Sequence, residues 1–80
     1  MSEKQIEEVL KLCKEIRCSR SSIYGENWRQ MSLRGLLYGA CYKVERAIFT
    51  KDRYKRLDDV LDAINYLLFI SVKILEEIEP

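Results

Sequence analysis

The sequence predicts an all-α fold in which a protomer of three helices, a long helical hairpin plus an N-terminal helix, joins others in an oligomeric helical bundle. Apolar residues recur every three or four positions along most of the 80-residue chain, as one face of a helix requires. One proline and three glycines leave few helix breaks. A chain of this length forms a single domain, residues 1–80, and so small a core seldom supplies more than about 3 to 5 kcal/mol without a staple or a partner.

The first helix is expected over residues 3–17. Glutamate and lysine side chains occupy one face, and the other face is apolar, with Ile6, Val9, Leu10, Cys13 and Ile16. The serine-rich segment 18–25 follows, and we expect it to form a loop that ends at Gly25.

The second helix is expected over residues 28–49, where a wide apolar stripe continues. Asn27 matches a helix-start signature, and Ser32 is the competing N-cap. Gly35 and Gly39 each weaken this helix by about 1 kcal/mol relative to alanine. Their spacing of four therefore suggests close approach by another backbone or by a ligand.

The third helix is expected over residues 57–78, after a short charged connection at 50–56 that is typical of antiparallel neighbours. Between residues 64 and 75 nearly every side of this helix is apolar. Two neighbouring helices cannot cover such a helix, so we expect a homodimer or homotetramer in which it is central.

Cysteine and histidine usage excludes several kinds of catalytic site. The chain has three cysteines, Cys13, Cys18 and Cys41, and no histidine. No C-x-x-C motif or cysteine–histidine cluster is present to hold zinc, and a histidine-based triad is excluded. We expect ordinary packing for Cys13 and Cys41, which fall on apolar helical stripes, and a reduced, intracellular setting.

The N-terminal residues 1–8 are charged where a signal peptide would be apolar, and the longest apolar run, residues 66–70, is too short to span a membrane. We therefore expect a cytoplasmic protein without membrane contact.

Charge is distributed unevenly along the chain, although the net charge is only +1. Residues 17–56 carry ten bases and three acids, whereas residues 57–80 carry one base and six acids. The middle segment can meet an anion, and the last third can hold a cation. Mutual neutralisation across a helical hairpin is an equally good interpretation.

A hairpin that turns near Arg53 would place residues whose numbers sum to about 106 opposite each other. In that register Glu45 faces Leu61 and Asp62. These three positions would then belong to one contact between the second and third helices.

Asp58, Asp59 and Asp62 lie close together on the third helix, where like charges repel unless a cation answers them. Lys43 and Arg46 can supply that cation, and so can a divalent metal. Mg²⁺ prefers carboxylate oxygens and often bridges to substrate phosphates. The candidate metal ligands are Glu45, Asp59 and Asp62.

Several short motifs within residues 22–70 resemble nucleotide modification associated domain one, a small phage and prokaryotic family. They are Tyr24-Gly25-Glu26-Asn27-Trp28, Met31 with Gly35, Lys43-Val44-Glu45-Arg46, and Asp58-Asp59-Val60-Leu61-Asp62-Ala63-Ile64-Asn65-Tyr66. That family is similar to the all-α NTP pyrophosphohydrolases of the MazG and dimeric dUTPase group. Those proteins are helical oligomers that split nucleoside triphosphates into monophosphate and pyrophosphate with Mg²⁺.

The resemblance implies one half of a metal site and omits the other. In the larger group one helix offers an E-x-x-E pair and the next an E-x-x-D pair, which Asp59-x-x-Asp62 matches in chemistry. The second helix has no E-x-x-E here, and only Glu45 stands in for it. Lys43 and Arg46 match the Lys-x-x-Arg element of the smaller family.

The leading hypothesis is therefore a nucleotide-binding MazG-like domain, with catalysis left open. In the catalytic version it is a Mg²⁺-dependent nucleoside triphosphate pyrophosphohydrolase whose catalytic and metal-binding residues are Glu45, Asp59 and Asp62. The expected substrate-binding residues are Tyr24 and Trp28 for the base, Lys43 and Arg46 for the phosphates, and Asn65.

Two other functions compete with this hypothesis. Nucleic-acid binding through residues 17–56 would use their arginines and lysines together with Tyr24, Trp28 and Tyr54. A purely structural homo-oligomer would use the apolar surplus of the third helix. In either case the charged residues of the hairpin would only pair with each other.

Overall fold

The computed structural model describes residues 2–79, apart from the side chains of residues 22–24. These residues form three α-helices, α1 (Glu3–Tyr24), α2 (Leu33–Phe49) and α3 (Arg53–Ile78), with a short 3₁₀ turn, η1 (Asn27–Gln30), before α2. The part of the chain so described contains no strand, which confirms the all-α class.

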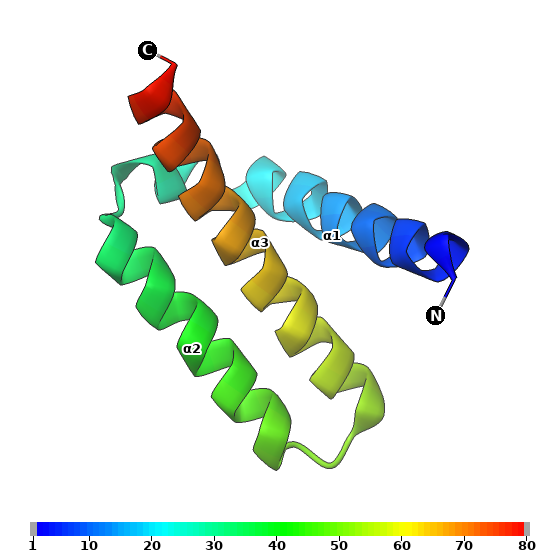
Figure 1. Ribbon diagram of the computed structural model, residues 1–80. Helices are drawn as coiled ribbons and strands as arrows, with labels where there is room; N and C mark the ends of the chain where they lie inside the picture. The colour runs from blue at the N-terminus through cyan, green and yellow to red at the C-terminus, as the bar shows by residue number, and fades with distance from the viewer. Residues whose placement is uncertain (1, 80) are drawn as a thin grey trace.

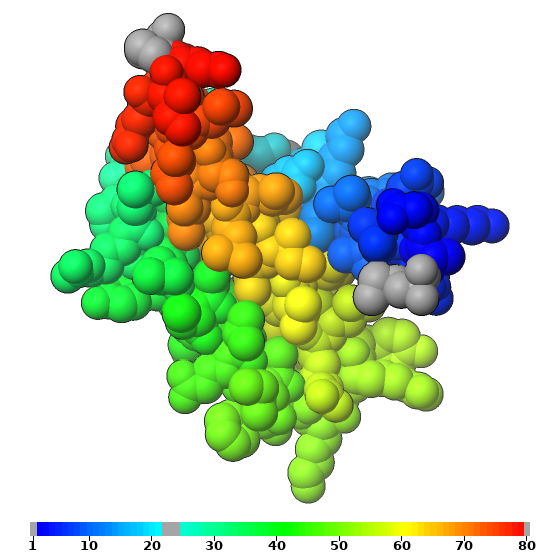
Figure 2. Space-filling model, in the orientation of Figure 1, coloured from blue at the N-terminus to red at the C-terminus, as the bar shows by residue number. Residues whose placement is uncertain are grey.

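Helices α2 and α3 form an antiparallel hairpin, and α1 crosses α3 on the side away from α2 (Figure 1). In the space-filling view α2 and α3 lie side by side along their lengths (Figure 2). The buried apolar side chains are few and mostly small: Cys13, Leu36, Ala40, Ala47, Leu61 and Ala63. Small residues at the contact let the helices approach closely, but they bury little apolar surface.

Helix α1 is longer than its apolar pattern indicates, because the segment expected to form a loop continues the helix to Tyr24. Gly25 ends it with φ of 64°, a left-handed conformation that favours glycine, and its N–H donates to the Ser21 carbonyl. Arg17 and Arg20 belong to this last part of α1 and bind side chains of α3. These polar contacts stabilise a segment that lacks an apolar stripe.

Polar side chains define the starts of all three helices. Ser2 and Gln5 form a capping box at α1. Ser32, not Asn27, is the N-cap of α2 and accepts the Gly35 N–H at 3.0 Å, while Asn27 begins η1. Asp52 caps α3, which therefore begins at residue 53 instead of 57.

Gly39 lies against the ring of Tyr66, so a side chain, and not the backbone or ligand that the glycine spacing predicts, makes the close approach there, while Gly35 has only Ser32 and Met31 beside it. A Cβ added at Gly39 would lie 2.8 Å from Cζ of that ring, too close for any real contact. The neighbour is thus a side chain of α3, not a backbone. The absence of a Cβ at this position lets an aromatic ring lie between α2 and α3.

Many large apolar side chains stay exposed in the single chain, including Leu37, Val44 and Ile48 on α2 and Val60, Leu67 and Ile74 on α3. No helix in residues 2–79 is long and apolar enough to cross a membrane.

Candidate functional site

Asp59 is buried in α3 and paired with Arg46 of α2. Arg46 Nε lies 3.1 and 3.0 Å from the two carboxylate oxygens, and Nη2 lies 2.5 Å from Oδ1. The hydrogen bonds from Arg46 hold the pKa of Asp59 below its ordinary value, and the same bonds raise the pKa of Arg46. The prediction that Arg46 pairs with Asp59 or Asp62 is therefore confirmed.

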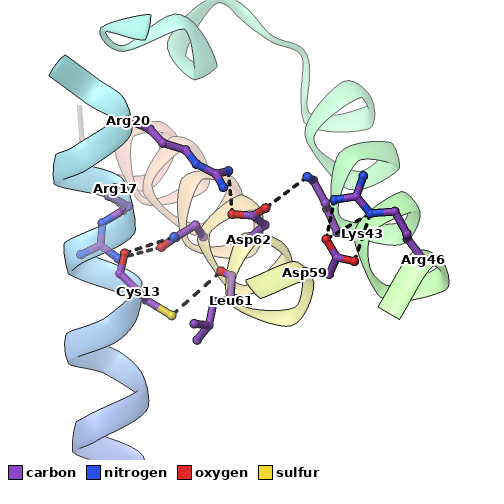
Figure 3. A network of polar contacts seen from close by, with 9 residues as sticks. Cys13, Arg17, Arg20, Lys43, Arg46, Asp59, Leu61 and Asp62 are labelled. Atoms are coloured by element: carbon purple, nitrogen blue, oxygen red, sulfur yellow. Dashed lines mark hydrogen bonds and ion pairs between the residues drawn. The ribbon is translucent and has the colours of Figure 1, made fainter. Parts of the chain in front are cut away.

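Asp62, one turn further along α3, meets two cations from opposite sides (Figure 3). Lys43 Nζ of α2 lies 3.1 Å from Oδ2, and Arg20 Nη1 of α1 lies 2.6 Å from Oδ1. The carboxylate is only 4 % exposed, whereas the Arg20 side chain is 52 % exposed. Arg20 Nη1 is thus within hydrogen-bond distance of Oδ1, but among the described residues no donor is aligned with this oxygen.

Asn65 connects α3 to α1 through both ends of its amide. Its Nδ2 donates to the Cys13 carbonyl at 3.1 Å, and its Oδ1 accepts from Arg17 Nη1 at 2.8 Å. The Cys13 thiol lies 4.0 Å from the Leu61 carbonyl, and burial raises the pKa of this thiol. Asn65 therefore fixes how α1 lies on α3.

A groove of about 800 Å³ lies between the C-terminal half of α1, η1 and α3. Its polar end contains Arg17, Arg20, Asp62 and Asn65, and most of the remaining wall is apolar, with Ile16, Met31, Leu68, Phe69, Val72 and Leu75. Pockets that bind small molecules commonly measure about 300 to 1,000 Å³ and combine an apolar wall with a few polar groups. The groove has this size and this composition.

The turn η1 closes one side of the groove and is fixed to α3. Trp28 stacks on Phe69 with ring centroids 4.5 Å apart, and the Arg29 guanidinium lies 4.6 Å from the Trp28 ring centroid. Arg29 also pairs with Glu76 at 3.0 Å, and Lys73 donates to the carbonyls of Arg29 and Met31. The Trp28 ring is thus already in contact with the Phe69 ring and the Arg29 guanidinium. Trp28 anchors η1 to α3 and also lines the groove.

Glu45 does not face Asp62 as the hairpin register predicts. Its side chain is exposed, and Lys43 occupies the position opposite Asp62. Lys43 and Arg46 are three residues apart and share a helix face, whereas Glu45 is turned about 100° from its neighbour Arg46. Only the cationic residues of this α2 segment therefore reach the aspartates.

The three expected metal ligands are not brought together. Within the described residues no three carboxylates, thiols or imidazoles gather where one ion could touch them all. Asp59 forms an ion pair with Arg46, and Asp62 forms ion pairs with Lys43 and Arg20. Both carboxylates are therefore already neutralised by protein side chains. Glu45, Asp59 and Asp62 as arranged here do not form a metal site by themselves.

The expected substrate-binding residues fall into three groups. Trp28 and Asn65 line the groove. Lys43 and Arg46 meet the aspartates from the α2 side and are not among the residues that line it. The side chain of Tyr24 lies outside the described residues.

Two groove residues, Arg17 and Arg20, are absent from the site that the sequence predicts. The sequence predicts a loop after residue 17, and in a loop Arg17 and Arg20 need not point the same way. In a helix, residues three apart lie on one face. A weak signal was the pair Ile16 and Ile23, which are seven residues apart as on one helix face, although the serine-rich segment between them carries no apolar stripe.

Comparison with known protein families, with curated proteins and with solved structures finds no match for this chain. The resemblance to nucleotide modification associated domain one therefore rests on the short motifs alone.

Proposed function

We propose that this domain binds a nucleoside phosphate in the groove between α1, η1 and α3. One observation carries the proposal: the groove has an apolar wall, and at its polar end an exposed arginine meets a buried carboxylate oxygen without an aligned hydrogen bond. An anionic ligand can offer Arg20 a better partner than Asp62 does.

The phosphates are proposed to bind Arg17 and Arg20, which lie one helical turn apart on α1. A guanidinium has five N–H donors, and the Arg17 contact with Asn65 uses one of them. Arginine forks match phosphate oxygens in a bidentate geometry. When Arg20 moves to a phosphate, Lys43 still neutralises Asp62.

The base and sugar are proposed to lie along the apolar wall, beside Val72 and Leu75. Ring systems gain affinity from burial against such side chains, and a few polar groups then fix their orientation. The Trp28 indole edge borders the same space, so a bound ring would change its environment.

The test is calorimetric titration with ATP, GTP and dTTP in EDTA, with tryptophan fluorescence as a second readout because Trp28 is the only tryptophan. We expect at least one of them to bind, and we expect Arg20→Gln to weaken that binding by about 1.5 to 3 kcal/mol, the worth of a charged hydrogen bond. The matched control is Arg34→Gln, which replaces an exposed arginine in the first turn of α2. This variant should bind the nucleotide like the parent. Equal binding by Arg20→Gln and the parent, or no binding by either, would overturn the proposal.

Mg²⁺-dependent pyrophosphohydrolysis is a second candidate, favoured by the buried Asp62 Oδ1 that accepts no hydrogen bond from the described residues. A divalent ion would have to enter together with the phosphates, because the protein offers too few oxygens of its own. The expected result is that Mg²⁺ or Mn²⁺ alone gives no heat, while the nucleotide and the metal each tighten binding of the other. Pyrophosphate release by the parent and not by Asp62→Asn would establish hydrolysis.

We also propose that the chain assembles as a homo-oligomer through one face of the α2–α3 hairpin. On α2, three exposed residues each come directly after a residue that faces α3: Leu37, Val44 and Ile48. On α3, the exposed Val60 and Leu67 each come directly after a residue that faces α2. Both helices are right-handed, but their chains run in opposite directions. Seen from one end of the hairpin, successive residues therefore turn clockwise around one helix and anticlockwise around the other. The same one-residue step therefore turns both apolar stripes to one side of the hairpin, which we call the hairpin face.

The hairpin face is suited to a second copy of the chain. Val60, Leu67 and Ile74 are spaced by seven residues, as are Leu37 and Val44, which is the spacing by which helices pack lengthwise against partner helices. Covering this face would add the apolar burial that the small monomer core lacks.

A further inference from the structure

The end of the α2–α3 hairpin combines exposed aromatic rings with positive charge. We call residues 49–56 the hairpin tip. It carries one acid, Asp52, and four bases, Lys51, Arg53, Lys55 and Arg56. Phe49 and Tyr54 are 77 % and 73 % exposed, the largest values among the exposed large apolar side chains of the described residues.

The acid of the hairpin tip is turned toward the backbone. The Asp52 side chain accepts the N–H groups of Tyr54 and Lys55 at 2.9 and 3.3 Å, as the N-cap of α3. The nearest exposed acid outside the tip, Asp58, follows two residues after it in α3. The charge that the tip presents to solvent is therefore mainly positive.

The aromatic rings and the bases of the hairpin tip are close enough to act together. The Arg53 guanidinium lies 5.8 Å from the Tyr54 ring centroid, so a flat cation and a flat ring share one surface. The tip lies at the end of the hairpin farthest from η1 (Figure 1), and its long side chains project from the body of the molecule (Figure 2). Neither the nucleotide groove nor the hairpin face uses these residues, which belong to the segment that the sequence offers as a nucleic-acid-binding alternative.

We infer that the hairpin tip binds single-stranded nucleic acid. Unpaired bases stack on exposed aromatic rings, and lysines and arginines neutralise the neighbouring phosphates. Duplex fits less well because its bases are already stacked, and the tip presents only the first turn of α3, too short to fill a major groove. An anionic membrane also fits less well, since interfacial binding requires a helix with a continuous apolar face, and the tip consists of a helix end, a short connection and one helical turn.

The test is fluorescence anisotropy with a labelled 15-nucleotide oligo(dT), measured over a series of salt concentrations. We expect log K to fall with log salt at a slope of about −2 to −3, from three to four phosphate contacts. The double variant Arg53→Gln/Arg56→Gln should lower that slope by about 1.4. Tyr54→Ala should weaken binding by roughly tenfold at each salt concentration with the slope unchanged, because stacking releases no counterions.

The control Lys11→Gln/Lys14→Gln removes the same charge from α1 and should bind like the parent. The inference is overturned if this control loses as much affinity as the tip variants, or if Tyr54→Ala binds like the parent. Equal affinity for a 15-base-pair duplex, or binding only to phosphatidylserine vesicles, would also overturn it. Circular dichroism of each variant confirms that the helices remain.

Discussion

Asp59 and Asp62 are both buried on α3, but basic side chains neutralise the two carboxylates in different ways. Asp59 accepts several hydrogen bonds from one arginine, which fixes both side chains. Asp62 is shared by Lys43 and the exposed Arg20, and one of its oxygens accepts no hydrogen bond from the described residues. Removing Arg46 would leave Asp59 as an unpaired buried charge, whereas Asp62 keeps Lys43 as a partner when Arg20 moves to a ligand.

The Arg46–Asp59 pair predicts how stability depends on pH. The pKa of Asp59 is lowered in the folded protein, so its contribution to stability is complete above the unfolded pKa of about 3.9 and is lost as the pH falls through the lower folded value. At pH 7, Arg46→Gln should lower the melting temperature by about 5 °C or more. The gap between variant and parent should narrow as the pH falls from 5 to 2.

Thermal melts followed by circular dichroism measure this gap, with Arg34→Gln as a control of equal charge loss. A gap that stays constant down to pH 2 would show that the Arg46–Asp59 pair does not titrate as described.

The two cysteines of α1, Cys13 and Cys18, are predicted to differ in thiol reactivity. Cys13 is fully buried with a raised pKa, whereas Cys18 is exposed. In a Cys41→Ser background we expect Cys18 to react with a disulfide reagent at least about tenfold faster than Cys13, because Cys13 must wait for local opening. Peptide mass spectrometry during the reaction assigns each thiol, and equal rates in the folded protein would contradict the packing of α1 on α3.

At the scale of elements, α2 and α3 approach closely because the contact is made of small residues and because Gly39 accommodates a ring. Polar caps at Ser32 and Asp52 begin the two helices. The remaining link, from α1 to α3, depends on the Asn65 amide and on two arginines. The hairpin is therefore held by close packing and ion pairs together, and α1 is attached to it largely by polar contacts.

Gly39 gives the prediction for the hairpin. Alanine favours a helix by about 1 kcal/mol over glycine, but here its Cβ would lie 2.8 Å from the Tyr66 ring, which also packs edge-on against Phe69. We expect Gly39→Ala to destabilise the protein by about 1 to 3 kcal/mol, as overpacking does. In a Tyr66→Leu background the same change should be neutral or stabilising.

Urea denaturation of the four proteins in this cycle gives the coupling between positions 39 and 66. Additive effects of the two substitutions would show that the ring does not limit the approach of α2.

At the scale of the whole molecule, the single chain has too few buried apolar residues for the apolar surface that it carries. Leu67 is 50 % exposed and Val44 45 % exposed on the proposed hairpin face. The chain also has two polar regions at different places, the groove beside η1 and the hairpin tip. Assembly through the hairpin face would leave both regions open to ligands.

The hairpin face predicts the oligomeric state. Sedimentation at micromolar concentration should give a multiple of the 9.5 kDa protomer mass. Leu67→Lys should weaken association by at least about tenfold, since a charge at an interface core is poorly tolerated. Leu10→Lys, an exposed leucine on α1, is the control and should associate like the parent.

Cys41 offers an independent readout of this assembly because it lies between Leu37 and Val44 on the same stripe and is exposed in the monomer. Its thiol should react more slowly as protein concentration rises. Sedimentation of the parent as a 9.5 kDa particle only, or a Cys41 rate independent of concentration, would contradict the proposed face.

The sequence by itself determined the helical class, the hairpin and the pairing of Arg46 with the aspartates. Helical periodicity is a local property, and the connection after Phe49 is too short for anything but an antiparallel return. It also indicated the close approach at Gly39, because a glycine within a helix needs a reason.

Only the tertiary structure decided the extent of α1, the side to which Glu45 turns and the place of the groove. The serine-rich end of α1 has no apolar stripe, and its helix is stabilised by contacts from Arg17 and Arg20 to α3, 42 to 48 residues away in sequence. A register that sums residue numbers places two helices opposite each other but does not fix how each helix is rotated about its own axis, and Lys43 and Glu45 differ by about 200° around α2. That rotation decides between Lys43 and Glu45 as the neighbour of Asp62, and it follows from the packing of Leu36, Ala40 and Ala47 against α3.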